Sequence, residues 1–235
     1  MTARSESAPT AATGVRATRS PGQRAGLTRE VVVAAARRIA DRDGLEKLSM
    51  RALARELGVM PNAIYSHVAG KGALLDALLD SLLGEIQAPE SDDWRDALVA
   101  IMDASRRLLV EHPSLIPEFL SRPTRGPNAL RLGELCIDLL ARGGVEGELA
   151  VQAFRSLLVH ALGFAAYEAP RLQDPDREAR VSRSVEFFSS SPNPDVRDVA
   201  GKLAQMPDRD EFLASLDWML DGVLAQAEAA GPQHK

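Results

Sequence analysis

Between residues 51 and 71 the sequence places several side chains that could recognise DNA. Asn62 offers an amide that can pair with the edge of adenine, and Ala63 offers a methyl group that can contact the methyl group of thymine. Met60 and Pro61 precede them, and a proline in the first turn of a helix costs no hydrogen bond. These four residues therefore suit the beginning of a helix that enters the major groove.

Four further side chains could anchor the DNA backbone or add a base contact. Arg51, at the start of the preceding predicted helix, can reach a guanine edge or a phosphate. Tyr65 and His67 can donate hydrogen bonds to phosphate oxygens. Lys71 begins the next predicted helix, where its ammonium group and the free backbone N–H groups together favour a phosphate. Taken singly, each of the last three has a plainer interpretation: a packed tyrosine, a surface histidine and a solvated lysine.

The elements that must position these residues follow from the apolar periodicity and the capping residues. Thr28 and Ser49 can cap two helices, the second over Met50–Leu57. Gly58 ends that helix, and a further short helix follows over about residues 61–67. A longer helix followed by two short ones joined at a glycine forms a helix-turn-helix pattern.

The rest of the chain is also predicted to be helical, with glycine and proline breakers between the segments. No two alternating apolar runs are joined by a tight turn, so no strand pair is predicted. The predicted fold class is therefore all-α. The later helices are predicted at 71 to about 86, 93–111, 114–121, 128–142, 148–168 (ending before Pro170), 176–189, 195–205 and 208–229.

Charge is divided unevenly along the chain. The net charge of the 235 residues is −5, whereas residues 1–72 carry 12 Lys and Arg against 6 Asp and Glu. This asymmetry indicates a small basic module for an anionic partner, joined to an acidic body. Residues 1–26 are rich in small and polar residues and predict a flexible basic arm. In that arm, Arg24 could contact a phosphate or the minor groove.

Composition and motifs argue against other classes of protein. Apolar residues make up 45% of the chain and charged residues 26%, as in a folded domain. The single cysteine, Cys136, excludes an intramolecular disulfide and fits a reducing cytosol. No unbroken apolar run approaches the roughly 20 residues that span a bilayer, and no signal sequence is present. A cytoplasmic protein without membrane contact is therefore predicted.

The common catalytic and cofactor motifs are missing from the sequence. It has no dinucleotide-binding or P-loop glycine motif, no di-iron Glu-x-x-His pair and no hydrolase elbow. The four histidines do not show metal-ligand spacing. We therefore predict that the protein is not an enzyme and holds neither a metal nor another cofactor.

The segment 58–78, GVMPNAIYSHVAGKGALLDAL, strongly resembles the tetracycline-repressor (TetR) family. The upstream segment 27–57, which contains GLEKLS, resembles the first two helices of that family. The resemblance covers about 50 residues with motif positions at fixed spacing. It implies a homodimeric transcription repressor that binds palindromic double-stranded operator DNA. It assigns phosphate contacts to Tyr65, His67 and Lys71, and base reading to Arg51 and residues 60–63.

The same resemblance implies how the chain is organised. It predicts a three-helix DNA-binding domain at 27–72, a ligand-binding and dimerisation domain at 73–230, and a tail at 231–235. Arg122-Pro123 and Leu162-Gly163 are similar to the C-terminal domain of tetracycline repressors.

One position departs from the tetracycline-repressor pattern. Where tetracycline repressors carry a histidine that helps to hold a drug-bound magnesium, the matching residue here is Glu118. A tetracycline–magnesium inducer is therefore not implied.

A small-molecule inducer of unknown identity is implied, and its pocket can be predicted only from residue types. The helices at 148–168 and 208–229 are expected to form the dimer contact, although their apolar residues could instead pack the core of one protomer. The pocket candidates are Trp94, Phe119, Phe154, His160, Phe164 and Tyr167. The dimer-contact candidates are Ala150, Ala153, Leu157, Ala161, Phe164, Ala165, Leu213, Leu216, Met219, Leu220 and Val223.

Two functions from different classes remain open at this point. The first is a ligand-responsive repressor that an inducer releases from its operator. The second is an all-α small-molecule-binding protein or enzyme with an incidental helix-turn-helix. Binding to upstream DNA that weakens steeply with salt would distinguish them.

Overall fold

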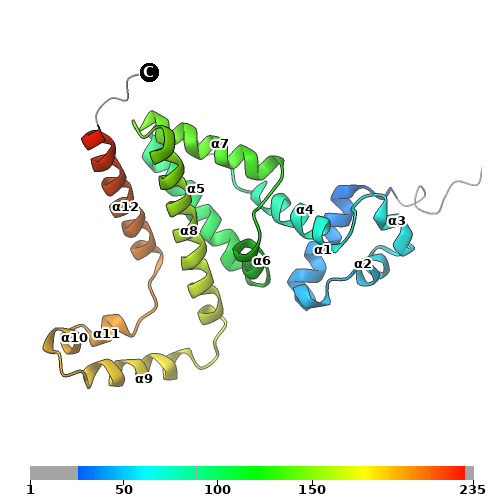
Figure 1. Ribbon diagram of the computed structural model, residues 1–235. Coiled ribbons are helices and arrows are strands. Elements are labelled where there is room, and N and C mark those ends of the chain that lie inside the picture. The colour runs from blue at the N-terminus through cyan, green and yellow to red at the C-terminus, as the bar shows by residue number, and fades with distance from the viewer. Residues whose placement is uncertain (1–25, 88, 231–235) are drawn as a thin grey trace, which may run out of the picture.

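The computed structural model describes residues 26–87 and 89–230 (Figure 1). The predicted arm, apart from Gly26, and the predicted tail lie outside these residues. The described residues form helices and no strand, which confirms the all-α prediction. The elements are α1 (Arg29–Asp43), η2 (Leu45–Lys47), α2 (Met50–Leu57), α3 (Pro61–Tyr65), α4 (Lys71–Leu83), α5 (Trp94–Glu111), η3 (Pro113–Leu115), α6 (Ile116–Ser121), α7 (Pro127–Arg142), α8 (Gly147–Leu172), α9 (Arg177–Ser189), α10 (Pro194–Asp198), α11 (Ala200–Leu203) and α12 (Arg209–Ala230).

The first three helices form a small unit at one end of the molecule (Figure 1). Both predicted caps are present: Thr28 Oγ1 accepts the N–H of Val31 at 3.3 Å, and Ser49 Oγ accepts the N–H of Ala52 at 3.1 Å. One face of α1 is buried against α2 and α4, because its apolar residues recur at helical spacing. The core of this unit includes Val32, Ala35, Ala36, Ile39, Leu53, Ala54, Ile64 and Val68.

The larger body is built on the packing of α5 against α8, with α7 and α12 beside them. Their buried faces form a second core that includes Leu98, Ile101, Met102, Leu139, Leu157, Phe212 and Leu216. The remaining elements α9, α10 and α11 pack mainly on one another and extend from the body in Figure 1. No residue of α9 is buried.

Helix α4 belongs to both cores. Leu74 and Leu75, near its start, are buried in the core of the small unit. Leu78, Leu79 and Leu82, one turn further on, are buried in the core of the body. A tilt of α4 would therefore disturb the packing of both parts, because close-packed cores resist deformation.

Several predicted helices differ from the structure in where they end or in being divided. Helix α4 ends at Leu83 instead of about residue 86, and the predicted helix 195–205 is split into α10 and α11. Helix α8 does not stop before Pro170 but continues to Leu172. Ala165 and Ala169 are buried in a small cluster with residues of α5 and α6, and this packing holds the last turn although proline removes one hydrogen bond.

Seven of the apolar residues proposed above for the dimer contact are buried within the protomer. Ala150, Ala153, Leu157, Ala161 and Ala165 are all buried within the protomer. On α12, Leu216 and Leu220 are buried, and the other named residues pack against the same core. The alternative interpretation, packing of the protomer's own core, is therefore correct for the buried side chains, and a dimer contact of the half-buried Phe164, Leu213, Met219 and Val223 stays a prediction.

A different apolar face of α8 and α12 is exposed. Val151, Leu158 and Val159 on α8 and Trp218 on α12 are exposed, Val159 by 68% and Trp218 by 71%. By length and composition α8 could cross a membrane, although the sequence contains no unbroken apolar run of that length. In its most apolar stretch of 18 residues, 28% of the residues are buried. The helix packs against α5, α7 and α12, so its apolar composition also serves a helical bundle.

Candidate DNA-binding surface and ligand cavity

The turn between α2 and α3 sets the surface that these helices present. Gly58 adopts a left-handed conformation with φ 64°, and its N–H donates to carbonyls in the last turn of α2. Pro61 opens α3, and at the end of that helix Ser66 Oγ donates to the carbonyl of Ala63 at 2.7 Å. Ile64 is fully buried. Burial of Ile64 turns the other residues of α3 toward the surface.

All eight DNA-binding candidates lie on this unit or at the start of α4. Met60 is 68% exposed and Tyr65 is 51% exposed. Arg51, Asn62 and Lys71 are also exposed, whereas Pro61, Ala63 and His67 are half-buried. Within the part of the chain that the structure describes, the side chains of Arg51, Tyr65, His67 and Lys71 are engaged in no hydrogen bond or ion pair. They are therefore available to a ligand.

The start of α4 has the features that the sequence predicts for a phosphate contact. Gly70 precedes the helix with φ 155°, and no side chain among the described residues accepts the first backbone N–H groups of α4. Lys71 is exposed in this first turn. Free N–H groups and an ammonium group at one place favour a phosphate. The contact of Lys71 with DNA stays a prediction.

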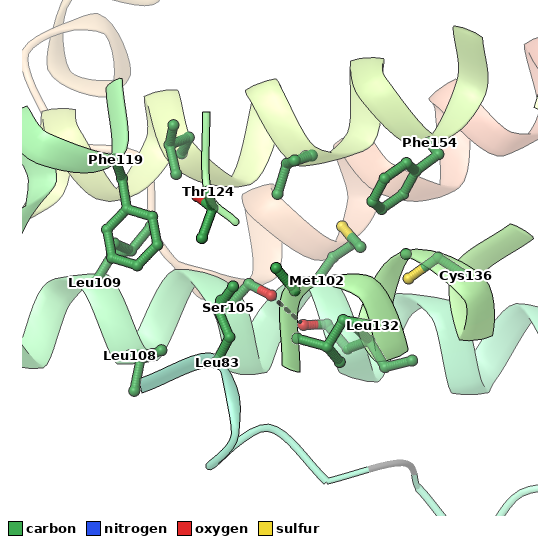
Figure 2. Close-up of a pocket in the computed structure, with 15 residues that line it drawn as sticks. Leu83, Met102, Ser105, Leu108, Leu109, Phe119, Thr124, Leu132, Cys136 and Phe154 are labelled. Atoms are coloured by element: carbon green, nitrogen blue, oxygen red, sulfur yellow. Dashed lines mark hydrogen bonds between the residues drawn. The ribbon is translucent and has the colours of Figure 1, made fainter. Parts of the chain in front are cut away.

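A cavity of about 230 Å³ lies in the body between α5, α7 and α8. Figure 2 shows the aromatic rings of Phe119 and Phe154 toward opposite ends of this space. The lining residues are Leu83, Ile101, Met102, Ser105, Leu108, Leu109, Phe119, Thr124, Ala129, Leu132, Gly133, Cys136, Phe154, Leu158 and Leu162.

The cavity is apolar, and its few polar groups carry no charge at neutral pH. Ser105 Oγ donates to the carbonyl of Ile101 at 2.8 Å, which leaves its lone pairs to accept a further bond. Burial raises the pKa of the Cys136 thiol to about 12, so the thiol stays protonated. Thr124 adds a hydroxyl group from the loop before α7. Among the described residues, no Asp, Glu, Lys or Arg side chain lines the cavity.

Two of the six predicted pocket residues, Phe119 and Phe154, line the cavity. Trp94 lies at the start of α5 and packs on Gly143, where a Cβ atom would come within 2.5 Å of the indole ring. Tyr167 is exposed beyond the cavity, with the guanidinium group of Arg171 3.4 Å from the centroid of its ring. Neither Trp94 nor Tyr167 lines the cavity, and their role in ligand binding stays a prediction.

His160 and Phe164 lie between α8 and α12 and do not line the cavity. His160 Nε2 is 2.7 Å from Ser215 Oγ, and its ring stacks on Phe212. Phe164 meets the same phenylalanine edge to face. Desolvation lowers the pKa of His160, which favours a neutral imidazole. The arrangement suits a satisfied histidine at a helix–helix contact.

Sequence reasoning missed most of the lining, which is aliphatic. Met102, Leu109, Leu132, Leu158 and Leu162 follow the same helical periodicity as ordinary core residues. No signal in the sequence separates a leucine that faces a void from one that packs on a neighbour.

Helix α4 meets the wall of the cavity at Leu83, its last residue, and through the acidic side chain of Asp80. Asp80 Oδ1 accepts the backbone N–H of Asn128 at 3.0 Å and that of Ala129, a lining residue, at 2.9 Å. Asp76 Oδ1 accepts a hydrogen bond from Arg122 at 2.9 Å. Arg122 also pairs with Glu118 at 2.9 Å. Glu118 is therefore held in an ion pair, and it shares the guanidinium group of Arg122 with Asp76.

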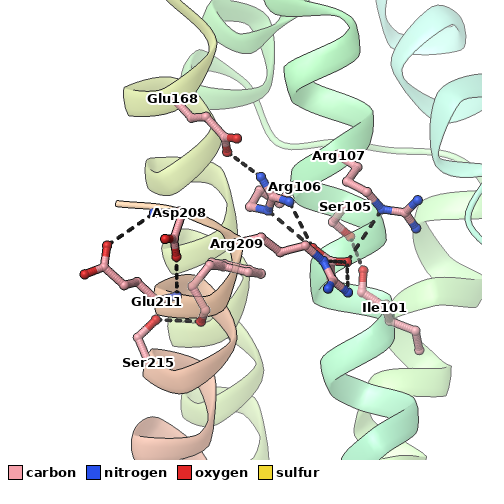
Figure 3. A network of polar contacts seen from close by, with 11 residues as sticks. Ile101, Ser105, Arg106, Arg107, Glu168, Asp208, Arg209, Glu211 and Ser215 are labelled. Carbon is pink, nitrogen blue, oxygen red and sulfur yellow. Dashed lines mark hydrogen bonds and ion pairs between the residues drawn. The ribbon is translucent and has the colours of Figure 1, made fainter. Parts of the chain in front are cut away.

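A network of charged side chains joins α5, α8 and α12 (Figure 3). Arg106 is almost fully buried, and it pairs with Asp103 at 3.1 Å and with Glu168. Asp103 also pairs with Arg209 of α12 at 3.0 Å. Buried charges need such partners, and breaking one pair leaves an uncompensated charge. The network holds these helices together without lining the cavity.

A helix-turn-helix unit with unpaired polar residues, joined by a shared helix to a helical body with an apolar cavity, defines the class of helical transcriptional regulators. Comparison with family models agrees. Residues 32–78 match "Bacterial regulatory proteins, tetR family", and residues 87–227 match "Tetracyclin repressor-like, C-terminal domain". The chain belongs to the tetR family of bacterial regulatory proteins and is a transcriptional regulator.

Individual relatives are similar over different lengths. The HTH-type transcriptional repressor DrrR1 of Streptomyces coeruleorubidus is 33% identical over 225 residues, which cover 90% of this chain and 82% of that protein. An HTH-type transcriptional regulator of Saccharopolyspora erythraea is 40% identical over 120 residues. That match spans 50% of this chain and about half of the relative, 51%.

Solved structures of ActR from Streptomyces coelicolor share the fold. The apo form is 29% identical with a TM-score of 0.78 and covers 87% of this chain and 98% of that chain. The complex of ActR with actinorhodin is 28% identical with a TM-score of 0.82 and covers 88% of this chain and 100% of that chain.

Proposed function

We propose that this regulator represses transcription as a homodimer on palindromic double-stranded DNA, and that a small-molecule inducer in the cavity releases it. The observation that carries the proposal is α4, which contributes to the core of the helix-turn-helix unit and to that of the body. The helix also reaches the cavity wall, directly at Leu83 and through the hydrogen bond of Asp80 to Ala129. One element can therefore respond to the ligand and reposition the DNA-binding unit.

The DNA contacts divide into two kinds. We assign base reading to Arg51 and residues 60–63, and phosphate contacts to Tyr65, His67 and Lys71. Their exposure and lack of internal partners support this assignment. The corresponding units would be a DNA-binding domain at 27–72 and a ligand-binding and dimerisation domain at 73–230.

The dimer would form through the exposed apolar face of α8 and α12. Val151, Val159 and Trp218 expose large apolar side chains there, and a monomer in water gains nothing from such a face. A two-fold symmetric contact would also place two α3 helices for successive major grooves, about 34–36 Å apart.

The cavity suits a small, uncharged and mainly apolar inducer. Its lining offers aliphatic and aromatic surface with hydroxyl groups from Ser105 and Thr124. A carboxylate or ammonium group would lose its hydration there without gaining an opposite charge. The complex of ActR with actinorhodin supports a ligand within the same fold.

Inducer binding would change the equilibrium between two dimer shapes, one with its α3 helices spaced for DNA and one without. A coupling free energy of about 1–3 kcal/mol is typical of such systems. In this proposal the protein acts in the cytoplasm, without membrane contact, cofactor or enzymatic activity.

The decisive experiment is footprinting of the purified protein on the intergenic DNA upstream of its own and adjacent genes. The proposal predicts a protected region with two-fold symmetry that weakens steeply with salt. Thermal-shift screening of small molecules would then identify a compound that stabilises the protein and removes the footprint. Absence of any footprint at low salt and without inducer would overturn the proposal.

A further inference from the structure

A groove between the C-terminal half of α1 and helix α2 gathers an unusual number of cations. Its charged lining residues are Arg42, Asp43, Lys47, Arg51, Arg55 and Glu56. Only Arg51 has a role in the function proposed above. The function proposed above does not explain why the other cations gather in this groove.

The two carboxylates of the groove are already neutralised. Arg42 lies 2.8 Å from Asp43 and 3.2 Å from Glu56, and Arg38 lies 3.4 Å from Glu56. Hydrogen bonding from Arg42 lowers the pKa of Asp43, so this carboxylate is ionised and paired at neutral pH. Two arginines and two carboxylates cancel in charge.

Three positive charges in the groove remain uncompensated. Within the described part of the chain, Lys47, Arg51 and Arg55 form no ion pair, although Lys47 and Arg55 are close enough to Asp43 to influence its titration. All three are exposed and line the same concave surface. They also recur at intervals of four residues, and on α2 this spacing places Arg51 and Arg55 on one face.

We propose that Lys47 and Arg55, on either side of Arg51, form a groove that receives the phosphate backbone of one DNA strand. The proposal rests on the DNA-binding function proposed above. Helix α2 is the first helix of the helix-turn-helix, the one that crosses the backbone while the second helix enters the major groove. Like-charged side chains without internal partners repel one another, and the negative charge of a polyanion relieves that repulsion. The counterions that the DNA releases on binding add to the affinity and make it depend on salt.

The test measures the affinity of full-length wild type, Lys47→Ala, Arg55→Ala and the double variant for operator and for unrelated duplex DNA, between 50 and about 200 mM salt. Each single variant is expected to weaken binding to both DNAs by the same factor. Each should also reduce the slope of log affinity against log salt by about 1, and the double variant by about 2. Lys202→Ala is the matched control, because Lys202 lies on α11, where it pairs with Glu211.

A variant that gains DNA affinity tests the proposal further, because a misfolded protein would lose affinity. Glu56→Gln removes a negative charge from the groove and frees Arg38, whereas Arg42 keeps Asp43 as its partner. We expect this variant to bind both DNAs several-fold more tightly and with a steeper salt dependence. Unchanged or weaker binding by a folded Glu56→Gln protein would contradict the proposal.

The outcomes separate this inference from the proposed function. If wild type binds no DNA, both fail. If wild type binds its operator while the double variant keeps the wild-type salt slope, only the phosphate groove is wrong. A change of sequence preference in Lys47→Ala or Arg55→Ala would show base reading instead and would also overturn it.

Discussion

The carboxylate of Asp80 in α4 caps the first turn of α7 by accepting the backbone N–H of Ala129 at 2.9 Å. The residue before α7 is Gly126, which has no side chain to cap the helix, so a neighbouring helix supplies the acceptor. A Cβ atom at position 126 would come within 2.2 Å of the Asp80 carboxyl carbon. Ala129 also lines the cavity, so this contact, together with Leu83 at the end of α4, joins the ligand site to the helix that begins at Lys71.

Replacing Asp80 is expected to lower the stability of the protein and to weaken the coupling between inducer binding and DNA release. Asp80→Ala leaves two backbone N–H groups of α7 without their acceptor, which should cost about 1–2 kcal/mol in the free energy of unfolding. Asp80→Asn keeps one acceptor oxygen and should lose less. Urea denaturation measures the stability, and the inducer concentration that half-releases DNA should rise in Asp80→Ala. Wild-type stability in this variant would show that the cap contributes nothing.

The two kinds of DNA contact are separable by mutation. Tyr65→Phe and Lys71→Ala should weaken binding about equally on all sequences, because phosphates are the same everywhere, and Lys71→Ala should reduce the salt slope by about 1. Arg51→Ala and Asn62→Ala should in addition change the sequence preference. Binding to a set of operator variants in electrophoretic mobility shifts measures both effects. An unchanged affinity and salt slope for Lys71→Ala would disprove its phosphate role.

Filling the cavity should produce a repressor that no longer responds to inducer. A Cβ atom on Gly133 would meet no atom within 4 Å, so Gly133→Leu can extend into the empty space from α7. DNA affinity should stay within about twofold of wild type. The matched variant Gly133→Ala should retain the response and gain about 0.5–1 kcal/mol in stability, because alanine favours the helix.

Fluorescent probes test the predicted chemistry of that cavity. The uncharged N-phenyl-1-naphthylamine should bind wild type and Gly133→Ala but not Gly133→Leu. Its sulfonated analogue should bind wild type much more weakly, because the described lining offers no cation to pair with a sulfonate. Equal binding of the two probes would refute the preference for uncharged ligands.

Dimerisation should depend on the exposed apolar face of α8 and α12. Val159→Glu and Trp218→Glu place a charge on side chains that are 68% and 71% exposed in the protomer, so folding should survive while dimers dissociate. Leu130→Glu is the control, because Leu130 is 63% exposed on α7. Sedimentation velocity reports the mass, and monomers should lose operator affinity by at least about tenfold. If both variants remain dimers, the dimer contact does not lie on this face of α8 and α12.

The buried thiol predicts how stability depends on pH. The pKa of Cys136 rises from 9.0 to about 12 on folding, so the folded protein holds this proton more tightly. The stabilisation is complete below pH 9 and is lost as the pH rises from 9 toward 12, by up to about 1.4 kcal/mol per pH unit. Urea denaturation at several pH values measures it, and Cys136→Ala should have a flatter profile in this range. Parallel profiles would exclude the thiol as the cause.

Local structure in this chain could be predicted because its signals are local. Thr28 and Ser49 cap the helices that the sequence predicts, and Gly58 ends α2 in a left-handed conformation. The motif from Gly58 to Leu78 also predicts the family. Each signal depends on residues within a few positions of one another, so no knowledge of tertiary packing is needed.

Tertiary packing decided which face of each long helix is used. The same apolar periodicity in α8 was compatible with a dimer contact and with a core, and burial of Ala153 and Leu157 shows that this face belongs to the core. Tertiary packing also explains why α8 continues past Pro170, because Ala165 and Ala169 are buried against α5 and α6. Periodicity identifies an apolar face but not the partner of that face.

The sequence by itself determined the all-α class, the helix-turn-helix and the candidate DNA-binding residues, because these depend on local spacing and residue type. Only the tertiary structure placed the cavity, the Asp80 cap on α7 and the unpaired cations beside Arg51. A void and an interhelical cap are formed by residues that are distant in sequence. Whether a cation is paired depends on which carboxylates the fold brings near it. The positions of all three features follow from the balance of packing and charge over the whole fold, and no segment contains that information alone.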